Sequence, residues 1–553
     1  MMSNVLTQNQ LDFVLRAAKA WQNYFEVKGR LYGVEQPTAE QVAIIQQEEK
    51  HFLILGSAGS GKSITLLYKL LKKLEQEAQR QRILYLSFNK TLVDDAKKRL
   101  NLSPGFDSLK EKHDLHFETF YSMAAQLLKA IGFHQAKTLY TSLAELKKQE
   151  DKWLRRVQVL LDNYKETEEY QNLGEEKLYQ THDARFVLDE ILWLKANGYV
   201  QLEDYLDCER KGRSHNPMLT RKQRRTIFKL FEAYERLKRE IYHDDIDGED
   251  YALWLLKSME EIPETLKFDH IFVDEVQDLQ PMQLKAIAQL AKKTLTLSGD
   301  PKQTIYRRGP HSYSDLGIQI KGRRIRKLRF NFRSTRQIMT LARSLKFVDV
   351  DNDREDDLIF VREGPKPEIH YFSTLEEQNR FMIQEFAKII KDRPDASIAV
   401  IHRFEEINKN PMQTEVAKTL GRHYFLLPIE AYGSRFDYTQ ERKPIFFTDP
   451  YSVKGLEFDY VFILHFDRAH YPLKSLWDEL DKKADRASEA YIKDLDMLLN
   501  NEKKILYVAI TRAKQQVYLL CQGKKDTFLS PFIRDFDPED YQAFGFDKHK
   551  FVN

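Results

Sequence analysis

The sequence is poor in several features that define special classes of protein. Only two cysteines, Cys208 and Cys521, occur in 553 residues, which excludes a disulfide framework and a cysteine-rich zinc module. The apolar runs, such as residues 460–464, have the length of a strand and fall far short of the roughly 20 residues that cross a bilayer. No basic segment followed by an apolar one opens the chain, so no signal peptide is expected. We therefore expect a protein of the cytoplasm, in a reducing compartment.

An excess of charge of one sign is also lacking. Lysine and arginine number 87 and aspartate and glutamate 84, so the net charge is 87 − 84 = +3. A near-neutral total does not identify a nucleic-acid-binding protein, and local charge has to be considered instead. The 42% of hydrophobic residues excludes a wholly disordered or collagen-like chain. At roughly 100–200 residues per domain, the length predicts about three to four domains.

Short apolar runs without alternation indicate strands that are covered on both faces, as in a parallel α/β sheet. One series of such runs lies before residue 300 and a second after residue 340. The predicted strands are residues 51–55, 83–86, 270–273 and 294–297, and then 397–401, 445–448, 460–464 and 516–521. Charged, leucine-rich segments with helical spacing fill residues 124–266 and predict a helical insertion. Apolar residues within the first ~35 positions recur at helical spacing, which predicts a helix that packs on the main body of the protein.

The segment after the first predicted strand fits the phosphate-loop pattern G-x-x-x-x-G-K-[ST], and a helical pattern follows it, as the motif requires. Glycines let backbone N–H groups surround phosphate oxygens, the lysine reaches the β and γ phosphates, and the hydroxyl of the last residue ligates Mg²⁺. The predicted nucleotide-binding residues are Gly56, Ser57, Ala58, Gly59, Ser60, Gly61, Lys62 and Ser63.

Two carboxylates end the predicted strand 270–273. Asp274 is placed to hold the magnesium ion, and Glu275 to orient or deprotonate the water that attacks the γ-phosphate. Lys62 and Asp274 lie 212 residues apart, so one nucleotide site implies a large insertion between its two halves.

With these motifs in place, the chain resembles the UvrD/Rep/PcrA-type DNA helicases of superfamily I, over residues 41–514. The resemblance implies two RecA-like P-loop NTPase domains, ATP and Mg²⁺, and a role for each motif. Gln41 would read adenine, Gln303 would sense the γ-phosphate, and Phe332 and Arg333 would contact the adenine and the γ-phosphate. Gly455 and Glu457 belong to the ribose motif, and Arg512 would be an arginine finger that contributes little to the core. Tyr306 and Ser452 would lie toward DNA.

The sequence departs from this family in several places. Ile64 and Thr65 follow the phosphate loop where an arginine is usual, so adenine stacking is expected to be weaker. The first DNA-contact region reads Thr119-Phe120-Tyr121 in place of Thr-Phe-His, and Thr119 and Tyr121 are its predicted DNA contacts. About 115 residues separate the fourth and fifth motifs. This spacing predicts a compact form that lacks most of the second regulatory insertion.

Two basic runs are candidates for contacts with the phosphate backbone. Residues 321–336 hold eight basic side chains and residues 210–225 hold seven, and neither run holds an acidic one. The alternative is a solvated face. In the second run, Arg221, Arg224 and Arg225 are the residues proposed to grip DNA. Phe88 could stack on a base of single-stranded DNA or belong to the core, and Asn89, which follows it, is a further candidate DNA contact.

These inferences predict an α/β protein in four parts: a helical extension (1–36), a first RecA-like domain (37–123 and 265–336), a helical insertion (124–264) and a second RecA-like domain (337–553). The expected activity is an ATP-dependent translocase on single-stranded DNA, moving 3′ to 5′ and unwinding duplex. The alternative is a DNA-stimulated ATPase, a sensor or the motor subunit of a repair or antiviral defence complex. In that case a partner such as a nuclease would complete the assembly.

Overall fold

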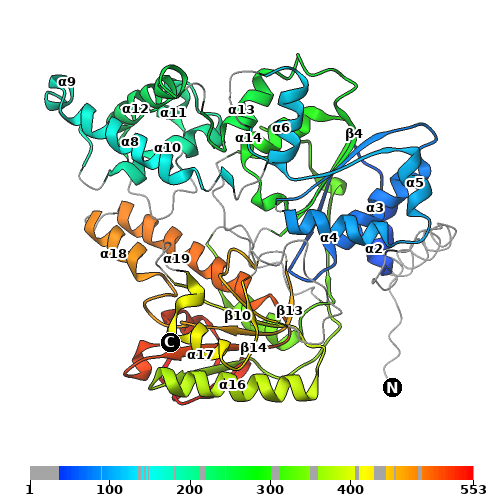
Figure 1. Ribbon diagram of the computed structural model, residues 1–553, viewed down its shortest axis with the longest axis vertical. Coiled ribbons are helices and arrows are strands. Elements are labelled where there is room, and N and C mark those ends of the chain that lie inside the picture. The colour runs from blue at the N-terminus through cyan, green and yellow to red at the C-terminus, as the bar shows by residue number, and fades with distance from the viewer. Residues whose placement is uncertain are drawn as a thin grey trace.

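The protein is described from a computed structural model, shown in Figure 1. The structure describes residues 31, 37–88, 90–133, 139–141, 145–146, 148–179, 182–208, 210, 219–242, 245–300, 311–348, 359–404, 410–428, 444–453, 456–483 and 489–551. The predicted N-terminal extension therefore lies outside the described residues, apart from Leu31, which is buried in the first α/β unit.

The first sheet has six parallel strands in the order β3-β2-β4-β5-β1-β6. The strands are β1 (His51–Gly56), β2 (Arg82–Leu86), β3 (Asp114–Glu118), β4 (Phe268–Val273), β5 (Ala291–Gly299) and β6 (Ile325–Leu328). Phe52 and Ile54 of β1 belong to one buried cluster, and Leu53 between them belongs to another. Both faces of the sheet are thus covered, which is why its strands read as unbroken apolar runs.

Helices cover the two faces of this sheet separately. One face packs against α2 (Ala39–Gln46), α3 (Lys62–Gln76), α4 (Lys90–Asn101) and α5 (Phe106–Lys112). The other face packs against α6 (Phe120–Ala130), α13 (Asp250–Lys257) and α14 (Pro281–Leu290).

A group of helices extends from this unit between β3 and β4. It consists of α8 (Glu150–Lys165), α9 (Glu168–Gln171), α10 (Ala184–Asn197), α11 (Leu202–Asp207) and α12 (Arg221–Glu240). Local sequence explains its helix ends. Thr220 and Gln223 form a capping box that starts α12, and Gly198 ends α10 in a left-handed conformation. Figure 1 shows the group beside the first sheet and above the second.

The second sheet has seven parallel strands in the order β11-β12-β10-β13-β14-β9-β15. Its strands are β9 (Glu368–Phe372), β10 (Ile398–Ile401), β11 (Leu426–Leu427), β12 (Ile445–Thr448), β13 (Phe458–Ile463), β14 (Ala513–Gln522) and β15 (Gln542–Phe544). The helices around it are α15 (Arg336–Ser344), α16 (Leu375–Asp392), α17 (Glu415–Gly421), α18 (Lys474–Lys483) and α19 (Glu489–Ile510). A two-stranded sheet of β7 (Phe330–Asn331) and β8 (Ile359–Phe360) lies between the two units in the chain.

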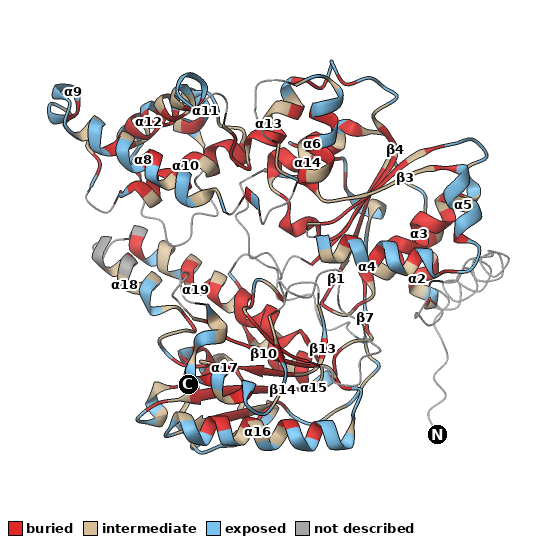
Figure 2. Ribbon diagram, in the orientation of Figure 1, coloured by how far each residue is buried: buried red, intermediate tan, exposed pale blue. Residues whose placement is uncertain are grey.

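The α/β class predicted from the sequence is confirmed, and all eight predicted strands are present within three residues of their expected ends. Figure 2 shows that burial is concentrated in both sheets and on the inner sides of the helices. Among the described residues, none of the helices combines the length and the apolar character needed to cross a bilayer.

Candidate nucleotide site and nucleic-acid interface

The phosphate loop joins the end of β1 to the start of α3. Gly59 and Gly61 have φ angles of 81° and 80°, a conformation that favours glycine, and Gly61 is the N-cap of α3. The ammonium group of Lys62 donates to the carbonyl oxygens of Gly56 (2.9 Å) and Ser57 (3.0 Å). Lys62 therefore lies across the loop at the N-terminal end of a helix, which is an arrangement suited to binding phosphate.

Asp274 follows β4 directly and is buried next to the phosphate loop. Burial and the neighbouring Glu275 raise its pKa, while hydrogen bonds from Ser298 and Ser63 and the charge of Lys62 oppose that rise. Tyr85 also donates to Asp274, at 3.2 Å. The carboxylate is therefore held against the P-loop hydroxyl by several donors.

This pair fits the predicted magnesium site. Ser63 and Asp274 supply hydroxyl and carboxylate oxygens, which Mg²⁺ prefers, and they lie within hydrogen-bonding distance of one another. They come from the two halves of the first unit, which the helical group separates in the sequence.

Glu275 has a left-handed backbone, with φ = 51° and ψ = 48°, which is uncommon for a residue other than glycine. Its side chain accepts a hydrogen bond from the amide of Gln277. The carbonyl of that same amide accepts from the backbone N–H of Asp300, at 3.1 Å. Gln277 thus fixes the orientation of Glu275 relative to the end of β5.

Gln41 lies in the first turn of α2. Its Oε1 accepts from the backbone N–H (2.9 Å) and the hydroxyl (3.3 Å) of Thr38, in a capping box. Since a backbone N–H can only donate, this contact fixes the orientation of the amide. A Cβ at Gly61 would fall against Gln41 Nε2, so the NH₂ group points toward the phosphate loop.

The segment after β7 rests on the phosphate loop. Asn331 Nδ2 donates to the carbonyl of Ala58 (2.7 Å), and the backbone N–H of Phe332 donates to that of Gly59 (3.0 Å). The ring of Phe332 stacks on Phe330 with centroids 5.9 Å apart. Phe332 and Arg333 therefore lie beside the phosphate loop.

The second α/β unit reaches this segment through Glu457. Its carboxylate pairs with Arg333 (2.5 Å) and with Lys514 (2.9 Å). Burial alone would raise the pKa of Glu457, but these two cations lower it to about 2. Ser334 adds a hydrogen bond of 2.7 Å to the carbonyl of Ala513. Residues 331–334, which we call the linker, thus contact the phosphate loop on one side and the second unit on the other.

Arg512 follows α19 and precedes β14, and its side chain is 1% exposed. It donates to the carbonyls of Val508 (2.9 Å) and Leu456 (3.1 Å). Burial, and after it the charge of Arg333, lowers the pKa of Arg512 to about 10, while Glu275 opposes the shift. The expectation that Arg512 contributes little to the core was wrong, because the guanidinium bonds backbone carbonyls inside it.

Four predicted site residues, Asn89, Gln303, Tyr306 and Gly455, lie outside the described residues. Among the described DNA candidates, Phe88 is half-buried. Thr119 caps α6, and Ser452 donates to Asp449 at 2.6 Å.

Tyr121 is in the core. It is 7% exposed, and its hydroxyl lies 3.4 Å from the amide of Gln283. This placement argues against the prediction that Tyr121 contacts DNA. The burial of Tyr121 could not be predicted from the sequence, because a tyrosine at the start of a helix can point either into the core or toward solvent.

The two basic runs are more constrained than their sequences suggest. Arg224 donates to three backbone carbonyls, those of Tyr205, Leu206 and Cys208, so it holds the end of α11 and is poorly placed to grip DNA. Arg221 is exposed and pairs with Asp207, and Arg225 is exposed. In residues 321–336, Arg323 and Arg324 pair with Glu49, and Arg336 pairs with Glu363.

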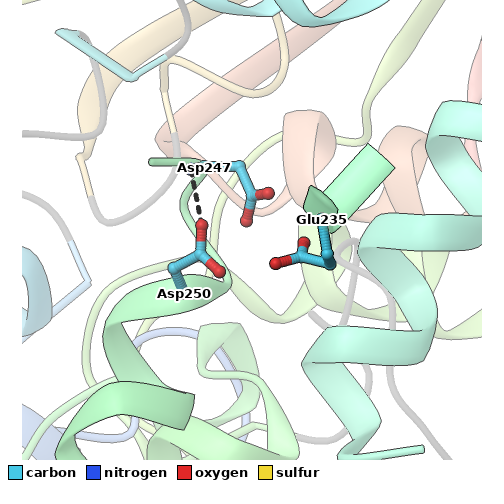
Figure 3. A group of neighbouring side chains, drawn as sticks. All are labelled: Glu235, Asp247 and Asp250. Carbon is cyan, nitrogen blue, oxygen red and sulfur yellow. Dashed lines mark hydrogen bonds between the residues drawn. The ribbon is translucent and has the colours of Figure 1, made fainter. Parts of the chain in front are cut away.

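The helical group contains a set of buried charges that sequence reasoning missed. Lys195, Lys238, Glu235, Asp247 and Asp250 form what we call the lysine–carboxylate cluster, and Figure 3 shows its three acidic members. The acidic oxygens lie close enough together to hold a metal ion. Each lysine, however, contacts all three carboxylates at 2.5–3.0 Å, so the ammonium groups already fill the place of a cation. No sequence spacing reveals such a cluster.

Two protein-family models match this chain. The family model of the UvrD/REP helicase N-terminal domain matches residues 37–309, and that of the UvrD-like helicase C-terminal domain matches residues 450–523. These ranges contain the phosphate loop and Asp274 in the first case, and Glu457 and Arg512 in the second.

Two relatives are ATP-dependent DNA helicases named PcrA. The one from Leuconostoc citreum is 23% identical over 425 residues, covering 71% of this chain and 52% of that protein. The one from Staphylococcus aureus strain Mu50 is 23% identical over 367 residues, covering 63% of this chain and 45% of that protein. The chain thus spans about half the length of these relatives.

A solved structure, the C-terminal domain of a possible DNA helicase from Lactobacillus strain WCFS1, is 18% identical and matches with a TM-score of 0.26. The match covers 38% of this chain and 98% of that one. The two family models and the PcrA relatives lead to one conclusion. The chain belongs to the UvrD/PcrA-like superfamily I DNA helicases, with two RecA-like domains.

Proposed function

We propose that this chain is an ATP- and Mg²⁺-dependent translocase on single-stranded DNA that moves 3′ to 5′ and separates strands. One observation supports this most strongly: Arg333 lies against the phosphate loop of the first unit and pairs with Glu457 of the second unit. A nucleotide bound at the loop would therefore bridge the two units. Hydrolysis in such a cleft changes the contact between them, which is how phosphate chemistry becomes motion.

Each residue has a distinct part in this proposal. Lys62 and the loop N–H groups bind the phosphates, and Gln41 and Phe332 hold the base. Glu275 orients the attacking water and takes its proton, and Arg333 and Arg512 stabilise the charge of the transferred phosphoryl group. Ser63 and Asp274 would hold Mg²⁺, which neutralises phosphate charge when bound.

The proposed division of the chain is the one expected from the sequence, with domain boundaries near residues 123, 264 and 336. All strands of the first sheet fall within 37–123 and 265–336, which supports it. One helix does not follow this division: α13 precedes residue 264, the proposed end of the helical insertion, but it packs on α6 and α14 of the first unit. The cytoplasmic location stays a prediction.

A second candidate is a DNA-stimulated ATPase with little unwinding activity, a sensor or the motor of a repair or antiviral defence complex whose partner supplies a nuclease. It is favoured by the short connection between Arg333 and Ser452. The described residues there are occupied by β8 to β12 and α15 to α17, and they contain no further domain.

Two measurements test these candidates. ATP hydrolysis would be compared with no nucleic acid, single-stranded DNA, duplex DNA and RNA, and strand separation with 3′-tailed and 5′-tailed duplexes. The first candidate predicts stimulation by single-stranded DNA and separation from 3′ tails. Stimulation without separation from either tail would favour the second candidate. Hydrolysis that no nucleic acid stimulates would contradict both.

A further inference from the structure

The lysine–carboxylate cluster joins three segments of the chain. Lys195 comes from α10, Lys238 and Glu235 come from α12, and Asp247 and Asp250 come from the turn that starts α13. Both lysines and both aspartates are less than 5% exposed. Since buried charges are tolerated only with close partners, the geometry of these three segments is tightly specified.

The turn is also fixed from within. Asp250 accepts from the backbone N–H of Asp247 (2.9 Å), the bond drawn in Figure 3, and Asp247 accepts from that of Glu249 (3.2 Å). Two aspartates that hold backbone groups and ammonium groups at once make the turn a rigid part of the cluster.

The other side of the turn rests on the first α/β unit. Glu249 accepts from the amide of Gln280 at 3.1 Å. A Cβ at Gly248 would lie 3.2 Å from the hydroxyl of Tyr121, and the ring of Tyr251 meets that of Tyr121 edge-on at 5.5 Å. The turn is thus clamped between the helical insertion and the core of the first unit.

This contact lies close in the chain to the acidic residues of the nucleotide site. Gln280 is the N-cap of α14, and Gln277, three residues earlier, donates to Glu275. A shift of α10 and α12 would therefore reach α14, and through its N-terminus the segment that orients Glu275.

We propose that Lys195 and Lys238 are positioning residues that couple DNA binding on the helical insertion to ATP hydrolysis. The lysine–carboxylate cluster holds the 247–250 turn so that movement of the insertion is passed to α14. This inference rests on the proposed function, because it requires hydrolysis that DNA stimulates.

The test is a pair of substitutions that keeps the charge of the cluster. Two lysines and three carboxylates give +2 − 3 = −1, and Lys238→Met with Asp250→Asn gives +1 − 2 = −1. The asparagine can still accept from the N–H of Asp247. The control is Lys229→Ala, which lies on α12 like Lys238 and removes an exposed ion pair with Glu169 of α9.

Hydrolysis would be measured without DNA and across a titration of single-stranded DNA, with DNA affinity measured separately by fluorescence anisotropy. For the double variant we expect unstimulated hydrolysis and the KM for ATP to stay within about twofold of the wild type. DNA affinity should also stay within about threefold, whereas the stimulation at saturating DNA should fall at least tenfold. The control should keep the full stimulation.

Full stimulation in the double variant would overturn the inference and leave the cluster a purely structural element. Wild-type protein that DNA does not stimulate would instead contradict the proposed function. If the double variant shows no cooperative unfolding transition, Glu249→Ala takes its place. It removes the acceptor for Gln280, and Glu249 makes no side-chain capping bond to α13. The same loss of stimulation is expected, and its absence would overturn the inference.

Discussion

The nucleotide site and the lysine–carboxylate cluster both bury several charged groups, but they arrange them differently. In the cluster, three carboxylates also lie close together, and burial and Asp247 raise the pKa of Asp250 to about 6. Two ammonium groups lie among them, however, and each contacts all three carboxylates within 3.0 Å. In the nucleotide site, like charges are neighbours: Asp274 lies beside Glu275, and Arg333 acts on Arg512. Those neighbours raise the pKa of Asp274 and lower that of Arg512, in both cases adding to the effect of burial.

The difference separates a structural arrangement of charge from a catalytic one. Carboxylates that each contact two ammonium groups are neutralised within the protein and fix the geometry of a core. Adjacent like charges work against each other and are stabilised by an added group of the opposite sign, such as a cation between two carboxylates or a phosphate between two arginines. The predictions below test whether this distinction holds, in order of decreasing effect.

The largest effect is expected for Glu275→Gln. The substitution keeps the size of the side chain but removes the base that takes the proton from water, so turnover should fall by about 10²–10⁴-fold. ATP binding should persist, because Lys62 and Asp274 are unchanged. Steady-state hydrolysis and equilibrium nucleotide binding would measure both. Glu169→Gln, in a surface pair, is the control, and near-normal turnover in Glu275→Gln would show that Glu275 is not the base.

Substitution of Arg512 should affect both chemistry and folding. Arg512→Ala removes a guanidinium that would face the transferred phosphoryl group, so a loss on the order of 10³-fold in turnover is expected. Because Arg512 also bonds the carbonyls of Val508 and Leu456, the melting temperature should fall. Calorimetry and hydrolysis on the same preparation would separate the two effects. A variant that loses stability but keeps its turnover would show that Arg512 stabilises the fold and takes no part in hydrolysis.

Lys195→Met should affect stability far more than unstimulated hydrolysis. It leaves two buried carboxylates and the half-buried Glu235 with one lysine, and breaking a buried pair in this way costs about 3–5 kcal/mol. Lys229→Ala, on the exposed face of α12, should cost at most about 1 kcal/mol. Urea titrations of the three proteins would give these free energies. If the two substitutions lower the free energy of unfolding equally, the buried cluster stabilises the fold no more than a surface ion pair does.

Glu457 is a carboxylate of the nucleotide site that is paired on both sides, and its pH dependence should show this. Arg333 and Lys514 lower its pKa to about 2 in the folded protein, against 4.5 for an ordinary glutamate. Its contribution to stability is therefore complete above pH 4.5 and is lost as the pH falls toward about 2. The stability difference between wild type and Glu457→Gln should be constant above pH 5 and shrink below pH 4.5. A difference that is independent of pH would show that Glu457 is not paired in solution.

The smallest effect concerns the grip on DNA. Arg221→Ala with Arg225→Ala removes two exposed cations from α12, and Arg224 is left in place because it holds the end of α11. If both contact phosphates, the slope of log affinity for single-stranded DNA against log salt should become shallower by about 1.4. Anisotropy titrations at several salt concentrations would measure it. Coincident slopes would show that this run is a solvated face.

Sequence could predict those parts of the site whose chemistry is local. The phosphate loop is one continuous segment with a fixed spacing, and Asp274 ends an apolar strand, so both were found directly. The two sheets were found because strands covered on both faces are unbroken apolar runs. The burial of Tyr121 and Arg512 was not predictable, since it depends on which side of a helix or strand end meets the core. The lysine–carboxylate cluster brings together residues from 195 to 250 whose separations follow no pattern.

Gly59 shows how closely the two units depend on a single position. A Cβ there would collide with the Cβ of Arg333, and the residue already has a left-handed backbone. Its hydrogen atom allows the chain that leads into the second unit to rest directly on the phosphate loop. Any larger residue would push these two segments apart, and the disturbance would spread beyond the loop to the distance between the units. The glycine therefore acts as a spacer of minimal thickness, and the distance between the phosphate loop and the segment of Arg333 is set in part by one missing methyl group.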